Sequence, residues 1–276
     1  MQVRIDHRTT YAYARPARYI VQLLRLTPRS GDGQFVRRWV IDTDVDAKLR
    51  RSEDAFGNVV HALYTEAPTN SLTVRVSGDV DTVDQGGLVR DELERLPPEV
   101  FLRETDLTRC DSEIAAYVDD IKTTDRLEAL HALMSALHRD IVFEVGATTT
   151  THSAAEVLKL RRGVCQDHAH LFIAAARRLG APARYVSGHM VRSDGRHEQD
   201  AAHAWAEAWV PNLGWVGFDP ANGICPTDAH VRVAVGLDYL GAAPVRGASY
   251  GGFGETLAVS VHVSDVRSAQ QSQSQN

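Results

Sequence analysis

Short runs that alternate between apolar and polar residues fill the first third of the chain. Turn-forming residues separate these runs, as at Gly31, Gly33 and Gly57. Alternation with a period of two is typical of strands that bury one face. The clearest runs are Tyr19 to Leu26, Phe35 to Ile41, Val59 to Tyr64 and Leu72 to Val76. Residues 1–85 are therefore predicted to form an all-β domain of the sandwich type.

The pattern changes after this region. Residues 86–108 are charged, contain Pro97 and Pro98, and sustain neither a strand period nor a helix period. This composition indicates a linker that runs over the surface between two domains. Apolar residues then recur with helical spacing in Asp111 to Ile121 and in Asp125 to Arg139, which predicts two helices.

Helices continue up to residue 180, and strands follow them. Ser153 and Glu156 have the spacing of a capping box, and a second helix is expected from about Cys165 to Gly180. The strands expected next are Arg184 to Val191, Ala202 to Val210, Trp215 to Asp219, Val231 to Val235 and Leu257 to Val263. Helices followed by an antiparallel sheet predict an α+β domain over residues 109–267. The polar residues 268–276 are expected to form a disordered tail.

Composition narrows the possible functions. The net charge is −6, the pI is near 6.0, and the basic residues are scattered, so no nucleic-acid surface is predicted. No stretch approaches 18 consecutive apolar residues, so neither a membrane span nor membrane association is expected, and a cytoplasmic location is the default expectation. Cys110, Cys165 and Cys225 have unrelated spacings, which suits a reducing compartment better than a disulfide framework. The sequence does not predict an oligomeric state.

Cys165 is the candidate nucleophile, because it stands where a helix is expected to begin. Unpaired backbone N–H groups and the helix dipole stabilise a thiolate at such a position. The backbone N–H of Cys165 could also stabilise the oxyanion of a tetrahedral intermediate. Most cysteines are small buried apolar residues, so this interpretation depends on the residues that follow along the chain.

His203 and Asp219 supply the imidazole and the carboxylate that a cysteine nucleophile needs. Both are expected on neighbouring strands of one hairpin. If the loop covers 211–213, residues 210 and 214 pair, and Asp219 lies diagonal to His203, within reach of its ring. A two-residue loop without a bulge would put the two side chains on opposite faces. A triad of Cys165, His203 and Asp219 therefore requires a loop with an odd number of residues, or a bulge.

Four segments of the chain carry a family resemblance: Arg162 to Asp167, Gly180 to Gly188, His203 to Glu207 and Gly214 to Pro220. Together they resemble the bacterial transglutaminase-like cysteine protease family. The β-rich first 80 residues, with the segment Asp54 to Asn58, are similar to the N-terminal domain of that family. The segment from His230 to Gly247 resembles its C-terminal extension, so the resemblance covers most of the chain.

The resemblance implies a papain/transglutaminase-like catalytic core in which helices pack on an antiparallel sheet. It also implies a catalytic triad of Cys165, His203 and Asp219, a peptide or protein substrate, and no cofactor. The reaction implied is cleavage of an amide bond or acyl transfer through a thioester, and hydrolysis by a cysteine peptidase or amidase is favoured. Two residues depart from the family pattern: His168 replaces a more usual aromatic residue, and Val145 stands where a tyrosine is expected.

Further residues are expected to line the substrate cleft. Period-two alternation places three large side chains of the predicted strand on the same face as His203, and Gln166 follows the nucleophile directly. The expected cleft residues are Gln166, Trp205, Glu207, Trp209 and Trp215.

Other interpretations compete with this one. A zinc site could use Cys165, His168 and His170 with His203 and Asp219, but no second ligand pair completes a tetrahedral set, so no metal is predicted. Transglutaminase-type transfer to an amine and a non-catalytic protein-binding module are the alternative functions. Cys110 and Cys225 are expected to be structural. Five histidines without ligand spacing are expected at the surface or in turns: His7, His61, His189, His197 and His230.

Overall fold

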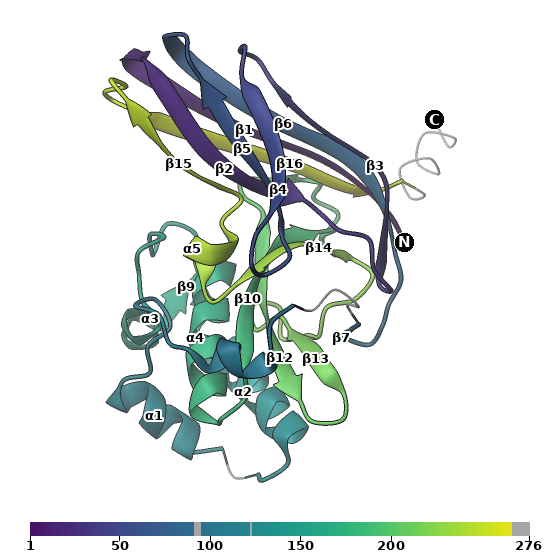
Figure 1. Ribbon diagram of the computed structural model, residues 1–276. Helices are drawn as coiled ribbons and strands as arrows, with labels where there is room; N and C mark the ends of the chain where they lie inside the picture. Colours follow the sequence, from purple (N-terminus) through teal and green to yellow (C-terminus); the bar gives the residue numbers. More distant parts are fainter. Residues whose placement is uncertain (91–94, 122, 267–276) are drawn as a thin grey trace.

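The computed structural model describes residues 1–90, 95–121 and 123–266. It has two parts that lie one above the other (Figure 1). The upper part contains only strands, and the lower part combines helices with a sheet. The predicted succession of an all-β domain and an α+β domain is confirmed.

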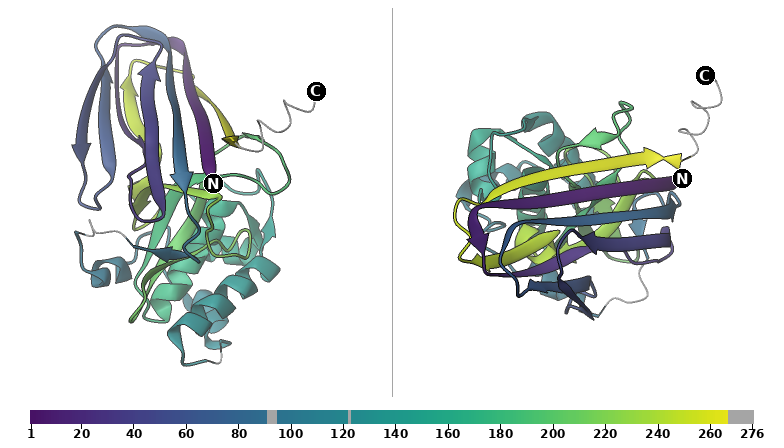
Figure 2. Two further views of the ribbon diagram at one scale, coloured as in Figure 1. Left: turned by 90° about the vertical axis from the view of Figure 1, so that its right-hand side faces the viewer. Right: turned by 90° about the horizontal axis from the view of Figure 1, so that it is seen from above.

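Two sheets packed face to face form the β domain (Figure 2). One sheet has the strand order β11-β16-β1-β6-β3 and the other the order β15-β2-β5-β4. Alternation along β2 buries Ile20, Leu24 and Leu26 and exposes Val21, which is the pattern expected of a sandwich. The strands near the N-terminus are β1 Gln2–Ala17, β2 Tyr19–Thr27, β3 Gln34–Thr43, β4 Lys48–Glu53, β5 Val59–Thr65 and β6 Thr69–Thr82.

The last two strands of the chain return to the β domain. β15 (Val245–Tyr250) pairs with β2, and β16 (Thr256–Asp265) pairs with β1. The expected boundaries, which placed everything from 109 to 267 in the catalytic domain, are wrong for these strands. They cover edges that β1 and β2 would otherwise expose. Because the paired strands are far apart in the chain, local sequence patterns do not reveal this pairing. The predicted tail at 268–276 lies outside the described residues.

A long buried helix forms the centre of the catalytic domain. This helix, α4, carries eleven buried residues, and α1, α2 and α3 pack around it (Figure 1). Asp111, Asp125 and Ser153 cap the three surrounding helices, and Ser153 forms the predicted capping box with Glu156. The helices are α1 Ser112–Asp119, α2 Arg126–Asp140, α3 Ala154–Leu160, α4 Cys165–Arg178 and the short α5 Tyr239–Ala242.

A five-stranded sheet with the order β14-β10-β12-β13-β7 packs against α4. Ala204, Ala206 and Ala208 of β12 belong to the same core cluster as Ala169 and Phe172 of α4, because small side chains allow a helix to approach a sheet closely. The strands of this domain are β7 Leu88–Val89, β10 Ala183–Met190, β12 His203–Val210, β13 Gly214–Phe218 and β14 His230–Gly236, together with the short β8 Val142–Phe143 and β9 Arg162–Gly163. The short β11, Glu198–Gln199, pairs with β16 of the β domain.

The segment between the domains is more than a surface linker. β7 adds to the edge of the catalytic sheet, and the 3-10 helix Pro98–Leu102 buries Phe101 completely. The ring of Phe101 packs edge-on against Trp215, with a centroid distance of 5.1 Å. The prediction of a surface linker over 86–108 is therefore wrong for these parts, since one apolar residue in a charged stretch anchors it to the core.

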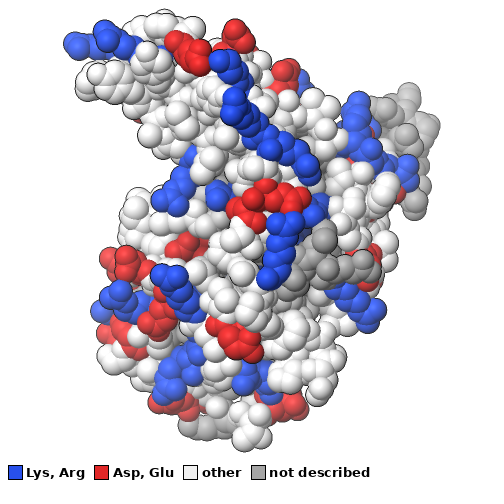
Figure 3. Space-filling model, viewed as in Figure 1, with Lys and Arg blue, Asp and Glu red and all other residues white. Residues whose placement is uncertain are grey.

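Acidic and basic side chains lie intermixed over the lower domain on the face shown in Figure 3. Among the described residues, we find no helix whose length and hydropathy would let it cross a bilayer.

Candidate active site

Cys165 occupies the first position of α4, as predicted. The end of the helix is held by Asp167, whose Oδ2 accepts hydrogen bonds from the Val164 backbone N–H at 2.8 Å and the Thr148 hydroxyl at 2.5 Å. A Cβ atom at Gly163 would lie 2.7 Å from the Asp167 side chain, so the chain needs glycine here. These contacts fix the direction of the helix N-terminus, and Cys165 remains a free, half-buried thiol.

The β12–β13 hairpin has the predicted register. Residues Val210 and Gly214 pair, so the connecting loop has three residues. His203 at the start of β12 and Asp219 just after β13 then lie side by side, and His203 Nε2 is 2.6 Å from Asp219 Oδ2. Cys165 lies on the other side of His203, close enough to raise the pKa of its ring.

His203 and Asp219 form an ion pair beside the Cys165 thiol. Burial alone would lower the pKa of the His203 ring, but the Asp219 carboxylate and Cys165 raise it to about 10. Burial would likewise raise the pKa of Asp219, but His203 and the other donors around it hold that pKa below its usual value. At neutral pH the ring is therefore cationic.

Two further side chains contact Asp219, and the sequence did not point to either. Asn222 Nδ2 donates to Asp219 Oδ2 at 2.7 Å, and its backbone N–H donates to Oδ1 at 3.2 Å. His230, expected at the surface or in a turn, is buried, with Nε2 3.3 Å from Asp219 Oδ2. Its position depends on the non-local pairing of β14 with β10, whereas Asn222, three residues after Asp219, could have been suspected.

Two family profiles match the chain. That of the bacterial transglutaminase-like N-terminal region matches residues 3–81, and that of the Transglutaminase-like superfamily matches residues 114–220, which include all three triad candidates. An uncharacterized protein of Mycobacterium leprae is 33% identical over 268 residues, covering 92% of this chain and 95% of that protein. The chain belongs to the transglutaminase-like superfamily.

Other proteins show where the superfamily likeness lies. A Protein-glutamine gamma-glutamyltransferase of Pseudomonas aeruginosa is 32% identical over 106 residues, which cover 33% of this chain and 15% of that protein. The crystal structure of a candidate cysteine protease from Cytophaga hutchinsonii superposes with a TM-score of 0.78 at 20% identity, covering 96% of this chain and 91% of that one. This structural likeness confirms the predicted fold class.

Of the residues expected to line a cleft beside Cys165, three are buried. Gln166 is half-buried beside it, but Trp205 is 2% exposed, Trp215 is 3% exposed, and Glu207 has no exposed surface. Glu207 binds Arg184 at 2.6 Å and Arg232 at 2.8 Å. The prediction of a cleft wall from this strand face is thus wrong for these residues, because the β domain and the Phe101 segment cover that face.

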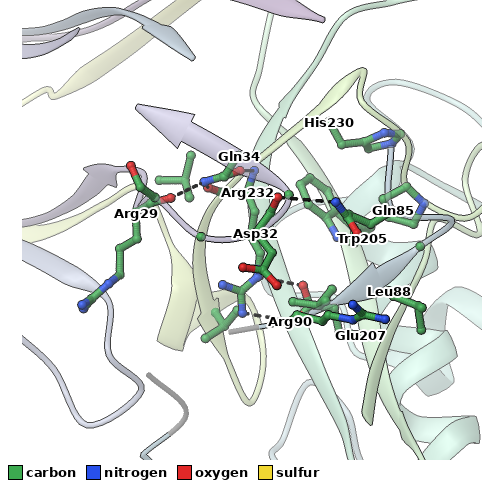
Figure 4. A pocket seen from close by; sticks show the side chains of 18 of the residues that line it. Arg29, Asp32, Gln34, Gln85, Leu88, Arg90, Trp205, Glu207, His230 and Arg232 are labelled. Atoms are coloured by element: carbon green, nitrogen blue, oxygen red, sulfur yellow. Dashed lines mark hydrogen bonds and ion pairs between the residues drawn. The ribbon is translucent and has the colours of Figure 1, made fainter. Parts of the chain in front are cut away.

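The covered face borders a cavity of about 120 Å³ between the two domains (Figure 4). Arg29, Asp32 and Gln34 approach it from the β domain, and Trp205 and His230 approach it from the catalytic domain. The rings of Trp205 and His230, which both pack against His203, therefore separate this cavity from the site of His203 and Asp219.

Two residues of the zinc interpretation, His168 and His170, have hydrogen-bond partners outside the site of His203 and Asp219. The ring nitrogens of His168 lie near the carbonyl oxygens of Val164 and Ile141, and His170 Nε2 accepts the Tyr239 backbone N–H at 3.0 Å. Val145, the other departure from the family pattern, is 76% exposed. Among the described residues, one group of side chains has the spacing of metal ligands: His203, Asp219 and His230. The Nε2 atoms of both histidines, however, already form hydrogen bonds with Asp219 Oδ2.

Proposed function

We propose that this protein is a cysteine peptidase or amidase that hydrolyses an amide bond, in a peptide or isopeptide link, through a thioester on Cys165. The observation that carries the proposal is that the His203 ring lies 2.6 Å from the Asp219 carboxylate and close enough to the Cys165 thiol to interact with it electrostatically. Thiol, imidazole and carboxylate in this order provide a nucleophile, its proton carrier and an orienting acceptor.

Each group has a defined part in the proposed reaction. The Cys165 sulfur attacks the amide carbon, and the backbone N–H groups at the start of α4 stabilise the oxyanion. The C–N bond breaks as His203 gives its proton to the leaving amine, which leaves a thioester. A water molecule then attacks the thioester, His203 takes up the proton, and the carboxylic acid and the thiol are released. Asp219 keeps the ring oriented throughout.

The positions of the indole rings support hydrolysis over acyl transfer. An enzyme that transfers the acyl group to an amine must keep water from the thioester. Trp205 and Trp215, which could have formed such a cover, are buried on the face towards the β domain and Phe101. Cys165 is partly exposed, so water has access to a thioester formed there.

Acyl transfer to an amine is the second candidate function. It is supported by the 32% identity, over 106 residues, to the Protein-glutamine gamma-glutamyltransferase of Pseudomonas aeruginosa. The third candidate, a non-catalytic binding module, has no specific observation in its favour. Free thiols at all three cysteines suit a reducing compartment, so we propose the cytoplasm as the location.

A peptide-amide library distinguishes the first two functions. Wild-type protein and the Cys165→Ala variant are incubated with the library and a primary amine, and ammonia, newly freed amino groups and incorporated amine are read separately. Hydrolysis predicts freed groups without incorporation, and transfer predicts incorporation. Cys225→Ala is the matched control, since Cys225 is also a half-buried free thiol and should be dispensable. Equal product formation by wild type and Cys165→Ala would contradict the thioester route.

A further inference from the structure

We propose that His230 is a positioning residue for the triad: as a neutral donor it holds the Asp219 carboxylate in the orientation that directs His203 towards Cys165. This inference rests on the proposed thiol chemistry, and it assigns a fourth residue to that site. His230 contacts neither the thiol nor any reacting atom, so its effect must pass through Asp219.

The backbone determines which nitrogen of His230 carries the proton. Thr227 and His230 lie in one tight turn, in which the His230 backbone N–H donates to the Thr227 carbonyl oxygen at 3.1 Å. The Thr227 backbone N–H in turn donates to His230 Nδ1 at 3.1 Å. An imidazole nitrogen that accepts a hydrogen bond carries no proton, so in the neutral ring the proton is on Nε2. Nε2 points at Asp219 Oδ2, 3.3 Å away, and His230 can therefore donate to the carboxylate without being charged.

The ring of His230 is also held from the side. Its edge packs against Trp205 at a centroid distance of 5.3 Å and an interplanar angle of 81°. Trp205 lies against His203 as well, at 6.0 Å. One buried indole thus fixes the spacing of the two imidazoles, and the two imidazoles converge on one carboxylate oxygen.

Asp219 Oδ2 therefore accepts hydrogen bonds from three side chains: His203, Asn222 and His230. A buried carboxylate with several donors keeps its charge and has little freedom to rotate. The titratable groups around His203 come from four elements: Cys165 on α4, His189 on β10, Asp219 after β13 and His230 on β14. Of these, Asp219 has the largest effect in keeping the ring protonated, and this effect depends on the 2.6 Å contact with Oδ2.

Two variants test the assignment. His230→Phe keeps an aromatic ring against Trp205 but removes both nitrogens, and His230→Gln keeps an N–H donor at a reach similar to that of Nε2. Labelling of Cys165 by iodoacetate is measured against pH, because this anion reacts faster while the neighbouring ring is cationic. Without the His230 donor the carboxylate can rotate out of the orientation that gives the 2.6 Å contact, so proton binding by His203 should weaken about threefold to tenfold, a downward shift of roughly 0.5 to 1 pH unit in the alkaline limb. His230→Gln should restore most of it.

The outcomes separate the two proposals. An unchanged or upward-shifted limb in His230→Phe would overturn the role of His230, and so would a lower Tm in both variants without any shift. Labelling of wild-type Cys165 no faster than that of Cys110 and Cys225 would overturn the proposed function instead. In that case ¹⁵N NMR titration of the His203 ring in wild type and His230→Phe still decides whether His230 acts through Asp219.

Discussion

Two buried ionic groups lie on the same face of β12, and they differ in what surrounds them. Near the start of the strand, His203 contacts Asp219 and the half-exposed thiol of Cys165. Four residues later, Glu207 has no exposed surface and binds two arginines, Arg184 and Arg232. The first group ends at a half-exposed thiol, whereas the second joins a buried carboxylate to two guanidinium groups beside the cavity between the domains.

The difference shows how the same strand pattern can serve chemistry or architecture. Burial alone would raise the pKa of Glu207, but the guanidinium groups of Arg232 and Arg184 hold it below its usual value. Arg184 also lies over the Trp215 ring, 3.8 Å from its centroid. Charge in this cluster is neutralised by two arginines, whereas His203 lies between a carboxylate and a thiol. Access to solvent therefore distinguishes a site from a structural ion pair.

The largest expected effect comes from removing the charge of Asp219. In Asp219→Asn an amide N–H can face His203 Nε2, which would place the ring proton on Nδ1 and leave no base beside the thiol. We expect the nitrophenolate burst from 4-nitrophenyl acetate to slow by about 10³-fold. The control is Asp228→Asn, which changes a carboxylate in the same loop region. Asp228 binds the N-terminal amine, so this variant should react at the wild-type rate. Rates within threefold of each other would remove Asp219 from the mechanism.

Glu207→Gln should act on stability and not on chemistry. The substitution removes the carboxylate that neutralises the buried Arg184 and the partly buried Arg232, so we expect the free energy of unfolding to fall by about 3 kcal/mol. Urea denaturation measures this, with Glu66→Gln as the control because Glu66 pairs with Lys48 at an exposed site. Below the unfolding transition, labelling of Cys165 should keep its wild-type rate. A loss of labelling in folded Glu207→Gln would show that the two clusters are not separate.

The sequence predicted the contact between His203 and Asp219 better than it predicted the surroundings of that contact. A three-residue loop is a local feature, and it is sufficient to bring Asp219 to His203. Alternation also assigned Glu207 to the correct face, but it could not identify partners on two neighbouring strands. His230 and the pairing of β15 and β16 depend on segments far apart in the chain, where no local period carries information.

A third buried group, which has no carboxylate between its rings, gives the smallest effect and sharpens the comparison further. His7 of β1 and His189 of β10 are both buried between the domains, with ring centroids 5.5 Å apart. Burial lowers the pKa of His7 to about 4, against the smaller opposing effect of Asp6, and it also lowers the pKa of His189. These are the shifts expected where no partner stabilises the charged ring, in contrast to His203.

The sign of the pH dependence follows from the direction of these shifts. Below the unfolded pKa of about 6.5 the unfolded chain binds protons that the folded His7 ring does not accept until the pH approaches its folded pKa. The contribution of neutral His7 to the free energy of unfolding is therefore fully present above pH 6.5. As the pH is lowered from 6.5 to 4, this contribution falls by about 1.4 kcal/mol for each pH unit. His7→Gln should flatten this acid slope in urea titrations, whereas His262→Gln, at a more exposed histidine paired with Glu198, should not. An unchanged slope in His7→Gln would mean that the folded domain interface accommodates a protonated ring at this position. The contrast between His7 and His203 would then be lost.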